Sequence, residues 1–269
     1  MKSLYKLLLL FSAIFLFASC EKEVTLDLKS AEPRLVIDAS ISDHTPCVVT
    51  LSLTQSFYDN DSYDRVSGAT VILYDEGMNS EVLEEVGSGY YQSKEPGVVG
   101  VTYFLKVIVD SETYEAEATI PHPVSLDETW IYEVKAGDKS WYSPSVIFND
   151  PKGEKNYYYT KLSINEKPLR TVYLHNDENR DGKRVHRILF FNKEDNDDKN
   201  LETGDQIDIE MQSIDYGMYE FLRSWTSFSG GDANPTTNFS GDVLGCFKAY
   251  SSSWISMIVS TDNIYQENI

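Results

Sequence analysis

Short apolar segments separated by polar turns run from Pro33 to His122, and no other feature of the sequence restricts the fold as much. In residues 115–118 glutamate and alanine alternate, which is the period of a strand with one face on a core and the other in water. The other apolar segments are residues 35–39, 48–53, 69–74, 89–92 and 103–109. About seven such strands with turns between them predict an immunoglobulin-like β-sandwich over residues 33–122.

The second half of the chain, residues 123–269, is predicted to be a second β-rich domain that carries one helix. Pro121-His122-Pro123 interrupts strand pairing, and we place the domain junction there. Apolar side chains recur at helical offsets in residues 215–228, which predicts an α-helix in that segment. The strand-like segments are residues 129–134, 145–148, 156–164, 186–191, 206–213, 243–249 and 254–259.

The amino end has the three parts of a bacterial export signal. Lys2 and Lys6 come first, residues 7–17 are apolar apart from one serine, and Ala18-Ser19-Cys20 ends the segment with small residues. The apolar run is too short for a spanning helix, which needs ~20 residues. We therefore predict that residues 1–19 are a lipoprotein signal peptide, that Cys20 carries the acyl chains, palmitate among them, and that residues 20–32 form a linker.

The residues after the lipidated cysteine predict where the protein is displayed. Glu21, Lys22 and Glu23 resemble the surface-export signal of Bacteroidota lipoproteins, so we expect an anchor in the outer membrane with the domain on the cell surface. Acyl chains contribute about 0.8 kcal/mol per buried methylene, so several of them hold a domain on a bilayer almost irreversibly. An anchor that faces the periplasm is the alternative.

Charge and cysteine content exclude some partners and leave one question open. The formal net charge is −20, so the surface repels nucleic acid and anionic lipid headgroups. Cys47 and Cys246 remain after Cys20 is acylated. In an oxidising compartment they can pair, and separate buried thiols are the alternative that the sequence favours.

One polar segment has the spacing of a calcium loop. Asp177, Asn179 and Asp181 place oxygen side chains at alternate positions and Gly182 stands in sixth place. The twelfth position, where a bidentate acid should close the loop, is Ile188. A hairpin between residues 172–174 and 188–190 explains the same residues by turn chemistry, and we favour it over calcium.

The sequence holds no catalytic motif that singles out particular residues. The four histidines are scattered, so no zinc site is predicted, and neither a phosphate loop nor a serine elbow is present. Acids are too numerous to select the pair that a glycosidase needs. We expect a protein without cofactor or metal that is not an enzyme; a carbohydrate-active enzyme is the less favoured alternative.

Aromatic residues gather at the start of the second half. Trp130, Trp141 and Tyr142 are the candidates for stacking on a ligand if they are exposed. If they are buried, they belong to the core, which is the usual place for most aromatic side chains.

A series of ordered segments resembles one known family. The segments are residues 20–28, 35–43, 66–71, 97–105, 113–116, 146–151, 156–159, 234–235, 238–241 and 243–247. Together they resemble the Bacteroidota lipoprotein family known as domain of unknown function 4249, over nearly the whole chain after the signal. The resemblance implies two β-rich parts, the first immunoglobulin-like, and a place in the cell envelope.

The resemblance also implies a function. Members of this family are commonly encoded beside TonB-dependent outer-membrane receptors, which implies an accessory role in uptake. The family has no established activity, so no catalytic residues carry over. We expect a non-catalytic accessory or binding subunit that works with such a receptor in nutrient uptake, on a ligand that the sequence does not identify. The alternative is a surface adhesin or glycan-binding module.

Overall fold

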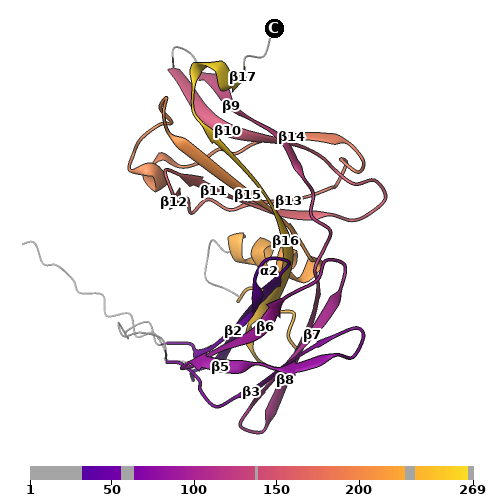
Figure 1. The fold of residues 1–269 in the computed structure, drawn as a ribbon. Coiled ribbons are helices and arrows are strands. Elements are labelled where there is room, and N and C mark those ends of the chain that lie inside the picture. The colour runs from indigo at the N-terminus through magenta and orange to yellow at the C-terminus, as the bar shows by residue number, and fades with distance from the viewer. Residues whose placement is uncertain (1–31, 56–63, 137–138, 228–233, 266–269) are drawn as a thin grey trace, which may run out of the picture. The chain divides into compact units, whose positions relative to one another are not determined.

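Three β-sheets and one α-helix make up the part of the chain that the computed structural model describes, which is residues 32–55, 64–136, 139–227 and 234–265 (Figure 1). The predicted signal peptide, Cys20 and residues 21–23 lie outside these ranges. Their lipidation and export therefore stay predictions.

The three longest strands lie in the second half of the chain. In chain order the strands are β1 (Leu35–Ser42), β2 (Pro46–Leu53), β3 (Thr70–Asp75), β4 (Ser80–Val82), β5 (Glu84–Gly87), β6 (Tyr90–Pro96), β7 (Thr102–Val109), β8 (Glu112–Thr119), β9 (Leu126–Ala136), β10 (Lys139–Asn149), β11 (Tyr157–Ile164), β12 (Lys167–Pro168), β13 (Tyr173–Asn176), β14 (Arg184–Ile188), β15 (Gln206–Ile214), β16 (Leu244–Ile258) and β17 (Ile264–Tyr265). The helix α2 is Tyr216–Thr226, and two 3₁₀ turns are Lys193–Asn196 and Thr261–Asn263.

One long sheet connects the two halves of the chain. Its order is β12-β11-β15-β16-β1-β2-β6-β5, with β13 also paired to β11. β1 and β16 run parallel, and their neighbours in the sheet are antiparallel. The first small sheet has the order β4-β3-β7-β8, and the second small sheet has the order β14-β10-β9-β17.

The first core lies between the long sheet and the first small sheet. Ile37, Ala39 and Ile41 of β1 are buried while Asp38 is exposed, as the alternation in the sequence predicts. This two-sheet packing confirms the immunoglobulin-like sandwich. The core also receives residues from the far end of the chain, among them Phe247 of β16.

The second core lies between the long sheet and the second small sheet. Strand β16 is 15 residues long and serves both cores, because Phe247 and Ala249 pack in the first while Ile255 and Met257 pack against the second. The described residues from Pro33 onward form one compact unit. The division into two domains at residues 122 and 123 stays a prediction.

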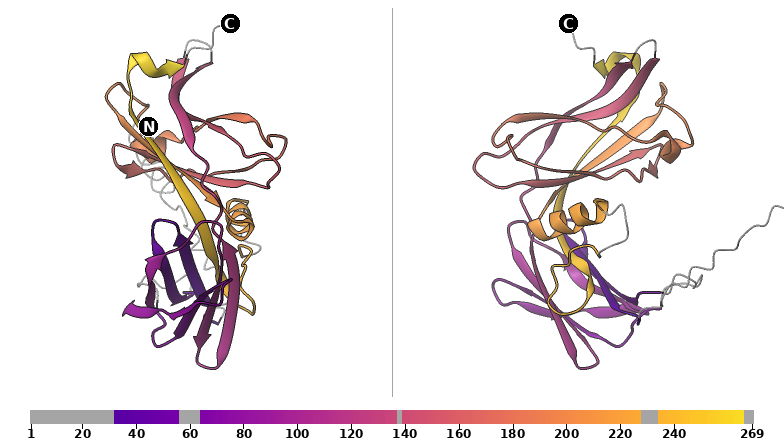
Figure 2. Two further views of the ribbon diagram at one scale, coloured as in Figure 1. Left: turned by 45° about the vertical axis from the view of Figure 1, so that its right-hand side comes forward. Right: turned by 180° about the vertical axis from the view of Figure 1, so that it is seen from behind.

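The predicted helix is present, and it packs on the opposite face of the long sheet. Ile214, Met218 and Leu222 form a third buried cluster there, with Tyr250 of β16 against it. The two views of Figure 2 show α2 beside β16. Among the described residues, no helix has both the length and the hydrophobicity needed to cross a membrane.

The hairpin interpretation of residues 172–190 is wrong. β13 pairs with β11 in the long sheet, whereas β14 pairs with β10 in the second small sheet. The segment between them therefore crosses from one sheet to the other over the second core. Backbone turns still form in this segment, since the N–H of Arg180 donates to the carbonyl of Asp177 and the N–H of Lys183 donates to the carbonyl of Arg180.

Candidate functional site

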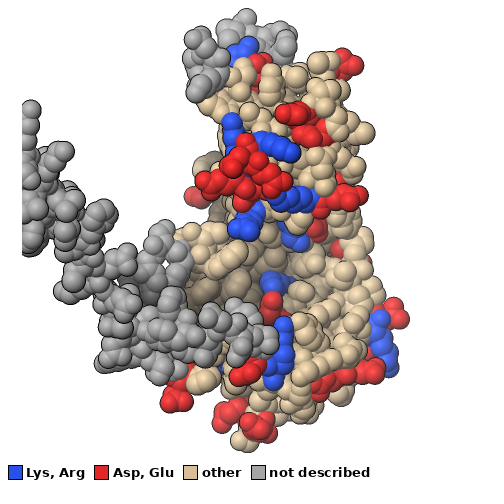
Figure 3. All heavy atoms as spheres, turned by 90° about the vertical axis from the view of Figure 1, so that its left-hand side faces the viewer, with Lys and Arg blue, Asp and Glu red and all other residues tan. Residues whose placement is uncertain are grey.

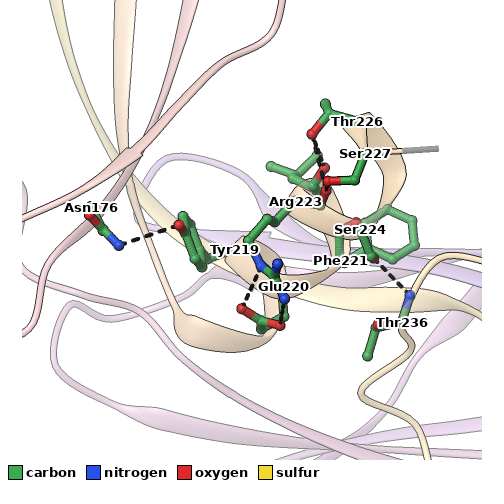
Figure 4. A network of polar contacts seen from close by, with 10 residues as sticks. Asn176, Tyr219, Glu220, Phe221, Arg223, Ser224, Thr226, Ser227 and Thr236 are labelled. Carbon is green, nitrogen blue, oxygen red and sulfur yellow. Dashed lines mark hydrogen bonds and ion pairs between the residues drawn. The ribbon is translucent and has the colours of Figure 1, made fainter. Parts of the chain in front are cut away.

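Helix α2 is fastened to the structure on both of its sides. The side-chain amide of Asn176 in β13 donates a hydrogen bond of 3.4 Å to the hydroxyl of Tyr219 (Figure 4). On the other side, the backbone N–H of Thr236 donates to Oγ of Ser224 at 2.9 Å. With the helix held in this way, one hollow lies at its first turn and another lies beside its later turns.

The hollow at the first turn, which we call the junction cleft, has a volume of about 750 Å³. Strands of the sandwich, strands of the second half and the start of α2 all contribute to its wall. The lining residues are Thr102, Glu117, Ala118, Thr119, Pro121, Lys155, Asn156, Tyr157, Ser213, Ile214, Asp215, Tyr216, Gly217 and Asn238.

Among the titratable groups that line the junction cleft, Asp215 has the largest shift in pKa. Burial raises the pKa of its carboxyl from 3.8 to about 7, although hydrogen bonds from backbone N–H groups, that of Met218 first, lower it. A carboxyl with such a pKa in a cleft has the properties of a general acid or base. Here it also caps the helix, because Oδ1 accepts from the N–H of Met218 at 3.0 Å.

An aromatic wall and a fixed amide complete the junction cleft. The ring of Tyr157 lies 5.5 Å from that of Tyr216 and 4.6 Å from that of Tyr219, between centroids. Tyr216 is 59% exposed, so its ring is available to a ligand. Asn238 is held in place because it both accepts from the N–H of Phe247 at 2.9 Å and donates to its carbonyl at 2.8 Å.

The hollow beside the later turns, which we call the helix groove, has a volume of about 550 Å³. Its floor is the outer face of the long sheet and its wall is the second half of α2. The lining residues are Val36, Asp38, Ser40, Tyr159, Lys161, Gln212, Met218, Phe221, Leu222, Trp225, Gly245, Lys248 and Tyr250.

Two of the three calcium candidates lie together, and a third acid joins them. Carboxylate oxygens of Asp177, Asp181 and Asp150 lie within 4.8 Å of one another. The third candidate, Asn179, occupies a left-handed turn, and its backbone carbonyl accepts a hydrogen bond from the Lys183 ammonium group. Three carboxylates supply part of the six to eight oxygens that Ca²⁺ takes, so calcium stays an alternative.

The two tryptophans among the stacking candidates share one face of the second small sheet. Trp130 pairs with Ser145 and Trp141 pairs with Val134 in the register of β9 and β10, so both side chains point away from the second core. Both are half-buried. Tyr142 points the other way and packs against that core, so it does not share a surface with the tryptophans.

The same face carries a second aromatic group. Tyr132 stacks on Tyr265 with a centroid distance of 5.9 Å, and His186 meets both rings edge-on at 5.9 and 5.6 Å. Trp130 is oriented by a hydrogen bond of 3.0 Å from its indole N–H to Glu128. The face therefore presents several rings in fixed orientations.

The two cysteines are separate buried thiols. Both are 0% exposed and neither is in a disulfide. Burial raises the pKa of Cys47 to about 12 and raises that of Cys246 as well. Neither thiol is therefore activated as a nucleophile.

Comparison with known proteins identifies the family. The model of the family described as "Domain of unknown function (DUF4249)" matches residues 21–255. The chain belongs to this family. No curated protein matches it. Among solved structures, a two-domain fibronectin type-III segment from chicken tenascin is similar with 13% identity and a TM-score of 0.22, over 85% of this chain and 99% of that one.

Two residues of the candidate sites in this DUF4249 protein, Asp150 and Gln212, are not identified by the sequence alone. Asp150 joins Asp177 and Asp181 only because the crossing between the sheets brings residue 181 back to the end of β10. Gln212 is one polar residue of the predicted strand 206–213. No local signal in the sequence distinguishes either residue.

Proposed function

We propose that this DUF4249 protein is a lipid-anchored binding subunit that works with a TonB-dependent receptor in nutrient uptake and performs no chemistry itself. The junction cleft carries the proposal. It has about 750 Å³ of space, and it lies where the sandwich, the second half and the start of α2 meet. Ligand sites have volumes of ~300–1,000 Å³ and lie preferentially between parts of a fold.

A binding role suits the cleft better than a catalytic one. The Asp215 carboxyl serves the first turn of α2, and the Asn238 amide serves the backbone of Phe247. Groups that are held by structural hydrogen bonds can orient a ligand but are poorly placed to move a proton during a reaction. The exposed ring of Tyr216 adds a flat apolar contact for a ligand.

The proposed location rests on the amino end of the chain. Acylation at Cys20 would hold the protein on the outer membrane, and Glu21, Lys22 and Glu23 support display on the cell surface. A binding protein tethered there stays at high local concentration beside a receptor in the same membrane. A net charge of −20 disfavours binding to anionic lipid headgroups, so the acyl anchor is the proposed contact with the bilayer.

Recovery of the receptor from membranes tests this proposal. The full chain, with its own signal, is crosslinked in intact cells and purified, and its partners are identified by mass spectrometry. We expect a TonB-dependent receptor, recovered with the native chain and lost with Cys20→Ser. Glu112→Gln, a change at an exposed acid of β8, is the control that should leave recovery unchanged. Purification without any receptor barrel would contradict the proposal.

A glycan-binding module is the second candidate, because Trp130 and Trp141 share the open face of the second small sheet. Aromatic rings in fixed positions are suited to flat apolar ligand faces. A glycan array probed with the full chain tests it. We expect binding that Trp141→Ala removes and that Tyr216→Ala, in the junction cleft, leaves intact; an array without binding rejects this candidate.

A further inference from the structure

We propose that the helix groove is a binding site for a neutral saccharide. The groove is separate from the junction cleft, with which it shares no lining residue, and from the face that carries Trp130 and Trp141. It contains a buried polar group without a partner, aromatic lining residues and internally neutralised charges. This inference stands whether or not a receptor is the partner.

The buried polar group is the side chain of Gln212 in β15. The residue is 1% exposed and lines the groove. Its amide nitrogen donates to Glu210 at 2.8 Å, while its carbonyl oxygen has no hydrogen-bond partner in the protein. An unpaired buried acceptor costs free energy. The oxygen has almost no accessible surface in the free protein, so a ligand donor reaches it when the Gln212 amide turns toward the groove, and that hydrogen bond removes the cost.

Four aromatic residues, Tyr159, Phe221, Trp225 and Tyr250, line the groove. Tyr159 lies directly opposite Gln212 in the register of β11 and β15. Phe221 and Trp225 come from α2, and Trp225 is 53% exposed. The exposed ring of Trp225 offers a flat apolar face at the entrance, while the polar floor offers hydrogen bonds. A sugar ring has both complementary surfaces, namely a face of C–H groups and a rim of hydroxyls.

The charges on the floor favour a neutral ligand. Lys161 pairs with Glu210 at 3.3 Å and Lys248 pairs with Asp38, so each ammonium group has a carboxylate beside it. On the face drawn in Figure 3, acidic and basic side chains likewise lie next to one another, and the surface is hollowed between them. An anion would have to displace a carboxylate in a protein of net charge −20.

The groove does not suit an extended peptide. Its floor consists of β1, β11, β15 and β16, and each of these strands has a neighbour on both sides in the long sheet. Their backbone N–H and C=O groups are therefore used within the sheet, and no strand can be added there. Recognition must come from side chains, as it does for saccharides.

Titration calorimetry with the full chain in nanodiscs tests the inference, since sugar-based detergents would compete. The probes are maltotetraose, cellotetraose and mannotetraose, with trigalacturonate as the anionic comparison. We expect a neutral tetrasaccharide to bind and trigalacturonate not to bind. Trp225→Ala and Gln212→Leu should each weaken binding by at least about tenfold.

Trp254→Ala is the matched control, because Trp254 is 55% exposed on the same sheet face but does not line the groove. It should leave the affinity unchanged. If Gln212→Leu fails to fold, the affinity of the surface variant Trp225→Ala still tests the inference. The inference is overturned if no neutral tetrasaccharide binds, if Trp225→Ala and Trp254→Ala behave alike, or if Trp141→Ala alone abolishes binding. The last result would leave the glycan-binding candidate intact.

Discussion

The hydroxyl of Tyr158 donates a hydrogen bond of 2.6 Å to Oδ1 of Asp150 and so ties β11 to the end of β10 inside the second core. Both residues are buried, at 1% and 4% exposure. Burial raises the pKa of Asp150, whereas the hydrogen bonds from Tyr158 and from the N–H of Gly182 lower it. The tyrosine therefore stabilises a carboxylate that its surroundings disfavour.

Removing that hydroxyl should destabilise the fold. Tyr158→Phe takes a donor from a buried carboxylate, and we expect a loss of about 1.5–3 kcal/mol at pH 8 in urea unfolding. Tyr173→Phe is the matched control, because the Tyr173 hydroxyl makes a longer bond of 3.4 Å to the neutral carbonyl of Leu189. It should lose about 0.5–1 kcal/mol. Equal losses for the two variants would contradict this account.

The raised pKa of Asp215 should make stability depend on pH in a defined direction. The folded carboxyl holds its proton up to about pH 7, while the unfolded one loses it near 3.8. Between these values the folded state binds more protons, so this group's contribution to the free energy of unfolding falls as pH rises from about 4 to about 7.

Asp215→Asn should remove that dependence. The amide oxygen can still accept from the N–H of Met218, but the side chain no longer ionises. At pH 8 the variant should be more stable than the native chain by about 1–4 kcal/mol, and near pH 4 the two should be equal. Urea unfolding across this range measures the difference, with Glu112→Gln as a control. A constant difference at all pH values would show that the carboxyl is not buried as described.

Local patterns in the sequence predicted the elements, and long-range pairing decided the rest. Alternating Glu115 and Ala116 marked β8, and a change of period marked α2, because burial of one face leaves a period in the sequence. The same period does not state which strand lies alongside. The sequence pattern therefore does not predict that β1 pairs with β16 in parallel, or that β13 and β14 belong to different sheets.

The candidate site depended on the same long-range pairing. Trp130 and Trp141 stand out in the sequence because aromatic residues gather at the start of the second half, but only the register of β9 and β10 shows that they share a face while Tyr142 lies on the other. The Gln212 carbonyl is buried beside α2 only because β15 and the helix pack together in the fold. Such neighbours come from segments that are distant in the chain, and no periodicity records them.

The buried thiols should be unreactive in the folded protein. Burial raises the pKa of Cys47 to about 12, so at pH 8 almost none of it is the thiolate that reacts with iodoacetamide. Mass spectrometry should find Cys47 and Cys246 unmodified in the folded chain and both modified in urea. A mass that shows the two sulfurs bonded to each other would contradict their separate burial.

A glycine fixes the contact between β1 and β16. Gly245 has φ of +100°, and a Cβ added there would lie 2.0 Å from the carbonyl oxygen of Ile37. Gly204 has nearly the same φ, +101°, with no atom within 4 Å of the added carbon. Gly204→Ala should therefore cost only the backbone strain, about 1–2 kcal/mol. Gly245→Ala adds a clash with the backbone of the paired strand and should cost more than about 4 kcal/mol or prevent folding.

Thermal and urea unfolding compare the two glycine variants. Because β16 contributes to both cores, a single unfolding transition should report the whole loss. Equal costs for the two alanines would mean that β1 and β16 do not approach each other at this residue.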